Sequence, residues 1–268
     1  MKFVIKFKSI LAFKLARLLP MSILKILEAI SHVGLGKGWD GGIQNEIKVL
    51  LHEAHKLGIV KIVALDIGAN QGHWTSALKA LNTSAEVHVF EPSASTFILL
   101  KQNLETLKGI FLYQLALGNS IKKANLYSNF ASSPLASLSK RKLIHEDIQF
   151  SNVEEINLVT LDSWSSQHPA IIPNVIKIDV EGHELEVLEG ALSLLLNIKI
   201  IQFEFGGTDI DSRVFFKDFW YFLSSAGFSI FRATPKGLME IKKYSEGEET
   251  FKFMTYYAIN TNALGSTV

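Results

Sequence analysis

Residues 59–74 read IVKIVALDIGANQGHW, and this stretch decides the fold. Its first part is a run of β-branched and apolar residues that ends at Asp66. A continuous apolar run of this length, bounded by glycine, indicates a strand that is buried on both faces. Gly68 and Gly72 follow, and a helix-like segment begins at His73. Glycine lets backbone approach a ligand closely and a helix N-terminus presents N–H groups to it, so the stretch predicts a nucleotide-binding turn.

Outward from this stretch, segments typical of strands alternate with segments of helical spacing. Such alternation predicts an α/β fold built on a parallel, doubly wound sheet. The last two strands have no helix between them, so the last strand is predicted to run antiparallel. Residues 130–150 are polar and irregular, and they predict an insertion. The predicted strands are Ile59–Leu65, Val87–Phe90, Phe111–Leu117, Ala124–Asn129, Ile156–Leu161, Asn174–Asp179, Ile198–Phe205, Phe228–Ala233 and Phe251–Asn260. The predicted helices include Glu46–Leu57, His73–Leu81, a short helix capped by Asp162, Glu184–Leu195 and Ser212–Ser225.

The composition is typical of a folded protein with a large core. Of the 268 residues, 48% are hydrophobic and 20% are charged, so disorder of the whole chain is not expected. The net charge of +1 gives no support to a nucleic-acid-binding protein. The chain has no cysteine, which excludes disulfides, thiolate metal sites and cysteine nucleophiles, and which suits a cytoplasmic protein.

The first 42 residues differ from the rest of the chain in charge and pattern. Six lysines and arginines precede the first acidic residue, Glu28. Residues 1–31 predict two helical pieces around Pro20, and the glycine-rich segment 34–42 predicts a linker. No apolar run reaches the roughly 18–20 residues of a transmembrane helix, and a clean signal-peptide core is absent. The pattern fits a lid helix that caps the domain core or a helix at the inner membrane surface, and both interpretations stay open.

These patterns divide the chain into three parts. Residues 1–42 form a basic amphipathic helical extension with its linker, residues 43–260 form the main α/β domain, and residues 261–268 form a disordered tail. A cytoplasmic location is expected, with peripheral membrane contact through residues 1–31 in one of the two open interpretations. Assembly into a homo-oligomer also stays open.

Four acidic residues lie at the ends of predicted strands: Asp66, Glu91, Asp179 and Glu204. In an open parallel sheet, ligands bind outside the carboxyl ends of the strands, so these side chains predict a polar crevice along one edge. Glu91 follows the second strand, at the position where an acid commonly accepts hydrogen bonds from both ribose hydroxyls of a nucleotide. Each acid taken alone is equally consistent with a helix cap.

The glycine turn does not fit a ligand that carries phosphate. A dinucleotide-binding turn requires G-x-G-x-x-G, but Asn70 and His73 occupy the second and third glycine positions, and no P-loop lysine follows. Asp66 at the mouth of the turn would repel a phosphate and attract a cation. The turn therefore favours S-adenosylmethionine, a cationic adenosine cofactor without phosphate.

Four segments together resemble the FkbM-type family of class I, S-adenosylmethionine-dependent methyltransferases. They are Asp66–Gly72 (DIGANQG), Phe90–Pro92 (FEP), Leu117–Asn119 (LGN) and Lys177–Glu184 (KIDVEGHE). The resemblance covers roughly residues 46–260, and its last segment is the most specific. It implies a Rossmann-like, seven-stranded, mostly parallel sheet with a reversed last strand. It also implies O-methylation of a hydroxyl on a glycan, a sugar or another hydroxylated metabolite.

The resemblance also implies roles for individual residues. The turn from Gly68 to Gly72 would pass along the methionine end of the cofactor, with Asp66 near its amino group. Glu91 would hold the ribose, and Leu117 or its neighbours would flank the adenine. The residues expected to bind the cofactor are Asp66, Gly68, Ala69, Asn70, Gln71, Gly72, Glu91, Pro92 and Leu117.

Methyl transfer to a hydroxyl requires alignment of oxygen, methyl and sulfur, and removal of a proton. Asp179 lies at a strand end and His183 follows it at the start of a helix, so either is a candidate base. His183 is equally consistent with a residue that only hydrogen-bonds acidic residues of that first turn. Glu204 is expected to orient substrate or Asp179. No third ligand accompanies the two carboxylates, so no metal is predicted.

The insertion carries a cluster of three basic residues, Lys140, Arg141 and Lys142. They are expected to be a solvated basic loop, with contact to an acidic glycan or a phosphorylated carrier as the alternative. Two other functions also stay open. One is a nicotinamide-dependent oxidoreductase on the same kind of sheet, and the other is a non-catalytic membrane- or partner-binding protein. The missing G-x-G-x-x-G counts against the oxidoreductase.

Overall fold

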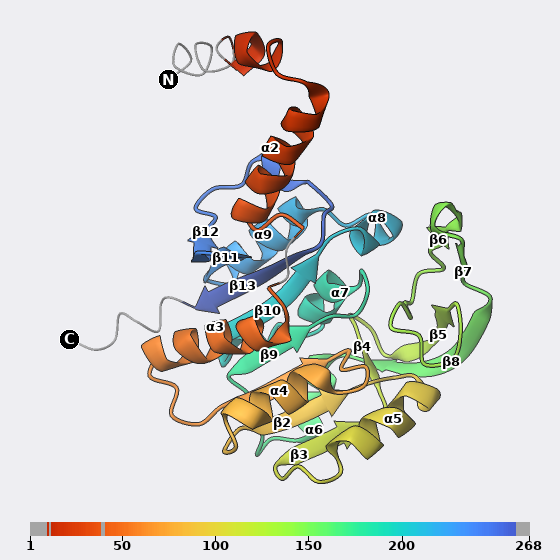
Figure 1. Ribbon diagram of the computed structural model, residues 1–268. Helices are drawn as coiled ribbons and strands as arrows, with labels where there is room; N and C mark the ends of the chain where they lie inside the picture. Colours follow the sequence, from red (N-terminus) through yellow and green to blue (C-terminus); the bar gives the residue numbers. More distant parts are fainter. Residues whose placement is uncertain (1–9, 11, 39–40, 261–268) are drawn as a thin grey trace.

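The computed structural model describes residue 10 and residues 12–38 and 41–260. Its centre is an eight-stranded sheet with the strand order β12-β11-β13-β10-β9-β1-β2-β3 (Figure 1). Strand β1 and its neighbour β9 are almost completely buried, as the apolar runs predicted. In sequence order the strands of this sheet are β1 (Val63–Ile67), β2 (Glu86–Phe90), β3 (Ile110–Tyr113), β9 (Val175–Ile178), β10 (Ile200–Phe205), β11 (Phe228–Thr234), β12 (Gly237–Glu240) and β13 (Met254–Asn260).

The sheet is parallel from β3 to β10 and mixed beyond it. Strand β13 pairs antiparallel with both β10 and β11, so the last strand of the chain is reversed, as predicted. The strands from β3 to β11 form the seven-stranded arrangement of a class I methyltransferase. Strand β12 adds an eighth strand through an antiparallel hairpin with β11, and this strand was not predicted from the sequence.

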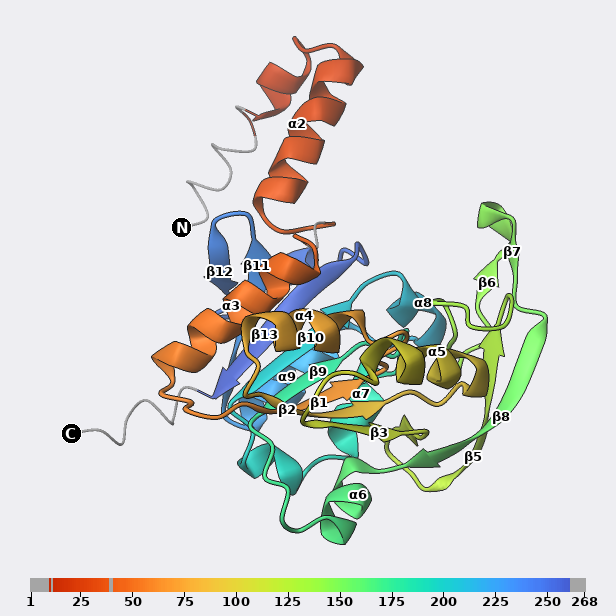
Figure 2. The same cartoon turned by 60° about the horizontal axis from the view of Figure 1, so that its bottom comes forward.

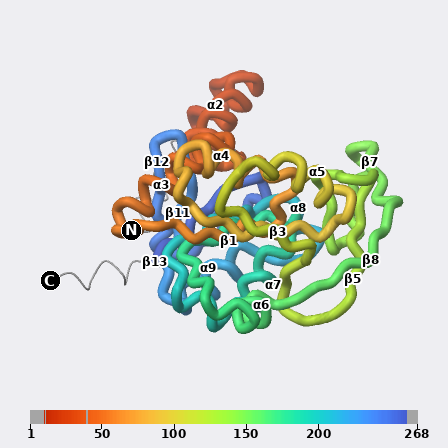
Figure 3. The backbone as a smooth tube through the Cα atoms, turned by 90° about the horizontal axis from the view of Figure 1, so that it is seen from below, coloured from red at the N-terminus to blue at the C-terminus, as the bar shows by residue number. Residues whose placement is uncertain are grey.

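Helices cover both faces of the sheet, and each face has its own apolar core (Figure 3). One face packs against α3 (Ile43–Lys56), α4 (His73–Leu81) and α5 (Ala94–Leu104). The other packs against α6 (Leu161–Gln167), α7 (Glu184–Glu189) and α9 (Phe216–Ser225). Alternate residues of β1 and β9 enter opposite cores, which is why both strands are apolar without a break.

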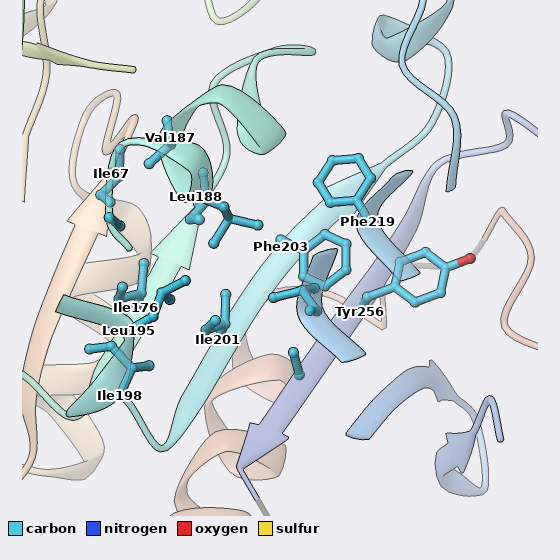
Figure 4. Packing of buried hydrophobic residues seen from close by; sticks show 14 of the residues in the cluster. Ile67, Ile176, Val187, Leu188, Leu195, Ile198, Ile201, Phe203, Phe219 and Tyr256 are labelled. Atoms are coloured by element: carbon cyan, nitrogen blue, oxygen red, sulfur yellow. The ribbon is translucent and has the colours of Figure 1, made fainter. Parts of the chain in front are cut away.

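The core beneath α7 and α9 is aliphatic near β9 and aromatic near β13 (Figure 4). Phe203 of β10 stacks between Phe219 of α9 and Tyr256 of β13, with ring centroids 5.0 Å and 5.5 Å apart. Burial of such large rings fixes the antiparallel part of the sheet against α9.

A second, three-stranded sheet lies beside the carboxyl ends of the parallel strands (Figure 2). It contains β4 (Ala116–Leu117), β8 (Asn152–Val159) and β5 (Lys122–Ser128), in that order. The predicted single strand 111–117 is therefore wrong, because β3 joins the large sheet and β4 joins the small one. The insertion is more ordered than expected, since β6 (Lys142–Leu143), η1 (Ile144–Glu146) and β7 (Ile148–Gln149) form a hairpin within it.

Several helix boundaries differ from the predictions. Thr160, not Asp162, caps α6 by accepting a hydrogen bond from the backbone N–H of Ser163. Asp162 instead accepts from the N–H groups of Ser193 and Leu194, at the start of the 3₁₀ helix η2 (Leu194–Leu196). The predicted helix 184–195 divides into α7 and η2. The predicted helix 212–225 corresponds to α9, which begins later, at Phe216, and the short helix α8 (Thr208–Ser212) before it was not predicted. A last 3₁₀ helix, η3 (Glu246–Glu248), lies between β12 and β13.

The N-terminal extension extends away from the domain (Figures 1 and 2). Residues 12–16 are helical, and after Pro20 helix α2 runs over Met21–Gly34, so the break at Pro20 is confirmed. Helix α2 contains no buried residue, so the interpretation as a lid over the core is wrong for this helix. Within the described residues, no helix is long and apolar enough to cross a membrane. Lys2, Lys6, Lys8 and the tail 261–268 lie outside the described residues.

Candidate active site

Two cavities meet at the carboxyl ends of the parallel strands. The first cavity lies between the turn after β1, the end of β2, the small sheet and the insertion. The second lies between the same turn, the start of α3 and the ends of β9 and β10. Three residues line both cavities: Gly68, Asn70 and Asp179. A ligand in one cavity can therefore face a ligand in the other across these three residues.

The glycine turn is packed directly against the end of β9. Gly68 has a φ of +71°, and a Cβ atom at this position would lie 1.8 Å from the carbonyl oxygen of Asp179. The N–H groups of Gly68 and Ala69 both donate to the carbonyl oxygen of Phe90, at 3.0 Å. Only glycine fits here, because a side chain would force the ends of β1 and β9 apart.

Glu91 is a buried carboxylate in the wall of the first cavity. One oxygen accepts from the backbone N–H of Asn70 at 3.0 Å, and the other accepts from that of Ser93 at 2.9 Å. Burial raises the pKa of Glu91 to about 7, although both hydrogen bonds act in the opposite direction. Each oxygen has a further lone pair, so the fixed carboxylate can accept two more hydrogen bonds.

An apolar surface from the small sheet and the insertion forms another wall of the first cavity. Leu126 of β5 and Ile156 of β8 face the cavity together with Ala136 and Leu138 of the insertion. Sequence reasoning identified Pro92 and Leu117 in this lining but missed these four residues. The period-two alternation of β5 and β8 was the available signal, since it predicts one apolar face per strand.

Asp66 lies beneath the site and lines neither cavity. It is fully buried, accepts a hydrogen bond from the Thr75 hydroxyl at 2.6 Å, and has the Lys177 ammonium 3.5 Å from its other oxygen. Burial raises the pKa of Asp66 above its ordinary value. Gln71 and Gly72 also lie outside both linings, and Gly72 acts as the N-cap of α4.

Lys177 connects the buried charges with the cavities. Its ammonium donates to the carbonyl oxygen of Gly68 and to a carboxylate oxygen of Asp179, both at 3.2 Å. Burial works to lower the pKa of Lys177, but the charges of Asp179, Asp66 and Glu204 raise it above its ordinary value. Lys177 therefore stays charged and partly neutralises Asp66, Asp179 and Glu204.

The two candidate bases, Asp179 and His183, and the expected orienting residue Glu204 lie in different parts of the site. Asp179 has a side chain that is 32% exposed and lines both cavities. Glu204 lines only the second cavity, and burial followed by the charge of Asp179 raises its pKa well above the ordinary value. His183 lines only the first cavity, and its two ring nitrogens contact the Ser139 hydroxyl and a Glu186 carboxylate oxygen, each at 3.0 Å. Asp179 is therefore the candidate that both cavities share.

Glu46 joins the second cavity from α3 and was not predicted from the sequence. Its carboxylate accepts a hydrogen bond from the Gln202 amide at 2.7 Å, and the Trp74 indole N–H donates to the oxygen of the same amide at 3.2 Å. The second cavity is therefore lined by three carboxylates: Glu46 of α3, Asp179 at the end of β9 and Glu204 of β10. Among the residues that the structure describes, no group of three or more metal-ligating side chains is arranged to hold a metal ion.

The insertion closes over the first cavity and is held there by Arg141. The guanidinium contacts a carboxylate oxygen of Glu181 at 3.1 Å and one of Asp211 at 3.3 Å, and the side chain is only 9% exposed. The Ser137 hydroxyl also donates to the carbonyl oxygen of Glu181, at 2.8 Å. The expectation of a solvated loop is thus wrong for Arg141, while Lys140 and Lys142 are exposed.

Comparisons with known proteins identify relatives of the chain. Residues 66–230 match the model of the methyltransferase FkbM domain. A hexuronic acid methyltransferase, AglP, from Haloferax volcanii is 32% identical over 160 residues, which cover 60% of this chain and 61% of that protein. Methyltransferase 1 from Beauveria bassiana is 24% identical over 141 residues, which cover 47% of this chain and 57% of that protein. The chain thus spans about three fifths of the length of the curated relatives it matches.

Two solved structures match most of the chain at low identity, with TM-scores below 0.5. A structure described as a putative caffeoyl-CoA O-methyltransferase from Staphylococcus aureus has a TM-score of 0.46 and 8% identity, covering 95% of this chain and 99% of that one. A precorrin-6y methyltransferase from Geobacter metallireducens has a TM-score of 0.40 and 12% identity, covering 79% and 87%. The assignment rests instead on the strand order and on the matched domain, which includes the glycine turn, Glu91 and Asp179. The chain belongs to the FkbM family of methyltransferases.

Proposed function

We propose that the protein transfers a methyl group from S-adenosylmethionine to a hydroxyl of a sugar, within a glycan or another hydroxylated metabolite. The observation that carries this proposal is the meeting of two cavities at Gly68, Asn70 and Asp179. Such an arrangement suits a donor in the first cavity and an acceptor in the second, with the reacting atoms between them. Membership of a methyltransferase family favours this reaction over nicotinamide-dependent chemistry.

The residues of the first cavity fit this cofactor. The lining contains no lysine or arginine to bind phosphate, in agreement with a nucleoside that carries none. Glu91 has the free lone pairs needed for two ribose hydroxyls, and the apolar wall of Leu126 and Ile156 suits the adenine ring. The side-chain oxygen of Asn70 is buried and has no hydrogen-bond partner among the described residues, so it can accept from the amino group of the methionine end. Bound there, the cofactor supplies an electrophilic methyl group.

The second cavity is polar and suits a hydroxylated acceptor. Its lining includes the carboxylates of Glu46, Asp179 and Glu204, which can accept hydrogen bonds from several hydroxyls of a sugar. The similarity to a hexuronic acid methyltransferase supports a sugar as the acceptor. Asp179 is the group positioned to take the proton of the attacking hydroxyl, because it reaches both cavities and Lys177 holds its carboxylate in place.

Two measurements test the proposal in sequence. Isothermal titration of the purified chain with S-adenosylmethionine should show binding at one site, and the absence of binding would overturn the donor assignment. Incubation with methyl-labelled cofactor and a panel of neutral sugars, amino sugars and uronic acids should then transfer label to oxygen. Label that mild base releases, as it would from the methyl ester of a carboxylate, or label found on nitrogen, would contradict hydroxyl methylation while leaving the donor assignment intact.

A further inference from the structure

Helix α2 has a continuous apolar face that no described part of the chain covers. Five large side chains of this face, Ile23, Ile26, Leu27, Ile30 and Val33, are between 41% and 63% exposed. At 100° per residue they fall within an arc of about 120°, the width of the apolar stripe that a surface helix normally buries. Here the stripe is turned to the outside, so it is available to a partner.

The opposite side of the extension is fixed to the domain. The His32 imidazole lies 2.5 Å from the Lys252 ammonium, and the carbonyl oxygen of Leu35 accepts from the Arg232 guanidinium at 2.7 Å. The Lys37 ammonium donates to the carbonyl oxygen of Gly247 at 2.6 Å. These contacts attach the base of α2 to β11 and to the loop that precedes β13, and they fix the direction in which the apolar face points.

The turns before Pro20 extend this surface and add positive charge. Phe13, Leu15 and Leu18 are 53% to 80% exposed. Lys14, Arg17 and Lys25 lie on the same segment of the chain, and the first 27 residues of the sequence contain no acid. Large apolar side chains together with lysine and arginine are typical of helices that lie in the interface of an anionic lipid bilayer.

We propose that residues 12–34 dock the protein on an anionic lipid surface. The apolar face enters the boundary between headgroups and acyl chains, and the basic side chains contact lipid phosphates. A second copy of the chain is a poorer occupant, because it would repeat the positive charges of Lys14, Arg17 and Lys25 and would bring no acid from residues 12–27 to balance them. An anionic bilayer instead supplies negative charge in its headgroups and an apolar phase in its acyl chains, next to each other.

Sedimentation with vesicles tests the proposal on the full chain. Vesicles of phosphatidylcholine with about one third phosphatidylserine should bind the protein, and pure phosphatidylcholine vesicles should bind it at least about tenfold more weakly. Added salt should weaken the binding to anionic vesicles. Equal binding to neutral and anionic vesicles, or none to either, would overturn the proposal.

Two triple variants locate the binding surface. Ile23→Ser, Ile26→Ser and Ile30→Ser together should reduce vesicle binding at least about tenfold without changing Tm, since none of the three is buried. The matched control replaces three isoleucines elsewhere on the domain with serine: Ile121, Ile144 and Ile172, which are 65% to 72% exposed. This control should bind vesicles as the unchanged protein does. Unchanged binding by the first variant would contradict the proposal. So would light scattering that shows a stable dimer which the first variant loses, because the face would then belong to a second copy.

Discussion

At the scale of single residues, the protonation state of Glu91 should control binding of the proposed cofactor. Its raised pKa of about 7 means that the free protein carries a proton on Glu91 below pH 7 and a negative charge above it. Two ribose hydroxyls donate to the ionised carboxylate, so binding favours the charged form. Below pH 7 the bound state therefore holds fewer protons than the free state, and binding must release one.

We expect the affinity for S-adenosylmethionine to rise with pH up to about 7 and to level off above it. Linkage sets the limit at about tenfold per pH unit on the acidic side. Titration calorimetry at several pH values, in two buffers of different ionisation enthalpy, measures both the affinity and the proton released. The Glu91→Gln variant should bind at least about tenfold more weakly and should lose this pH dependence. A variant that keeps the same pH dependence would show that another group titrates.

Gly68 and Gly58 give a matched pair for the packing of the glycine turn. Both have positive φ, +71° and +67°, so an added side chain costs about 1 kcal/mol of backbone strain at either position. A Cβ at Gly58 would meet open space, whereas at Gly68 it would collide with the carbonyl oxygen of Asp179. We expect Gly58→Ala to lower Tm slightly and keep cofactor binding. Gly68→Ala should lower Tm further and abolish binding, and equal effects in both variants would refute the role of the close contact.

Asp179 and His183 are distinguished by what surrounds them. Asp179 borders both cavities, whereas both ring nitrogens of His183 already contact Ser139 and Glu186. We expect Asp179→Asn to lower kcat by about 10²- to 10⁴-fold with little change in cofactor affinity. His183→Gln should lower kcat less, because it removes a contact to the insertion and not the proton acceptor. The reverse order in a methyl-transfer assay would identify His183 as the base.

At the scale of elements, the insertion depends on Arg141. Loss of this side chain would leave Glu181 and Asp211 in a half-buried position without their counter-charge. Burial and the nearby charge of Asp179 raise the pKa of Glu181 and the charge of Arg141 lowers it, so without Arg141 the carboxylate of Glu181 takes up a proton more readily, which limits the cost. The main consequence should thus be a looser insertion and not an unfolded domain.

We expect Arg141→Ala to weaken cofactor binding roughly tenfold and to make residues 130–150 more sensitive to limited proteolysis. The reason is that the insertion supplies Ala136 and Leu138 to the first cavity. Lys140→Ala is the matched control, since Lys140 is exposed, and it should leave both measurements unchanged. Equal protection from protease in both variants would mean that the hairpin does not depend on Arg141.

Local patterns predicted the parallel strands well because β1 and β9 are buried on both faces, and burial of this kind leaves an unbroken apolar run. The same reasoning placed Glu91 and Asp179 at strand ends that border the cavities. It could not divide residues 111–117, since the choice between the two sheets depends on pairing with β2 or β8 and not on local composition. The burial of Arg141 was hidden for a related reason, because its partners Glu181 and Asp211 are 40 and 70 residues away in the chain.

At the scale of the whole molecule, the segment after α2 is fixed to β11 and to the loop that precedes β13. Arg232 of β11 is buried there, donates to the carbonyl oxygen of Leu35, and pairs with Glu248 of η3. The Gly38 N–H also donates to the carbonyl oxygen of Phe253, just before β13. The base of the N-terminal extension is therefore part of the folded domain, even though α2 itself buries nothing.

Arg232→Met tests this connection. The variant leaves the carbonyl oxygen of Leu35 and the largely buried carboxylate of Glu248 without their donor, which should cost about 2–4 kcal/mol. For a domain of this size, each kcal/mol lowers Tm by roughly 2–4 °C. Calorimetry should show this decrease, and hydrogen exchange should increase over residues 21–38. Lys242→Met is the matched control, because Lys242 is 82% exposed in its pair with Glu240 and should change stability by less than about 0.5 kcal/mol. If both variants have the same Tm, the remaining backbone contacts attach the extension, and the direction of α2 does not depend on Arg232.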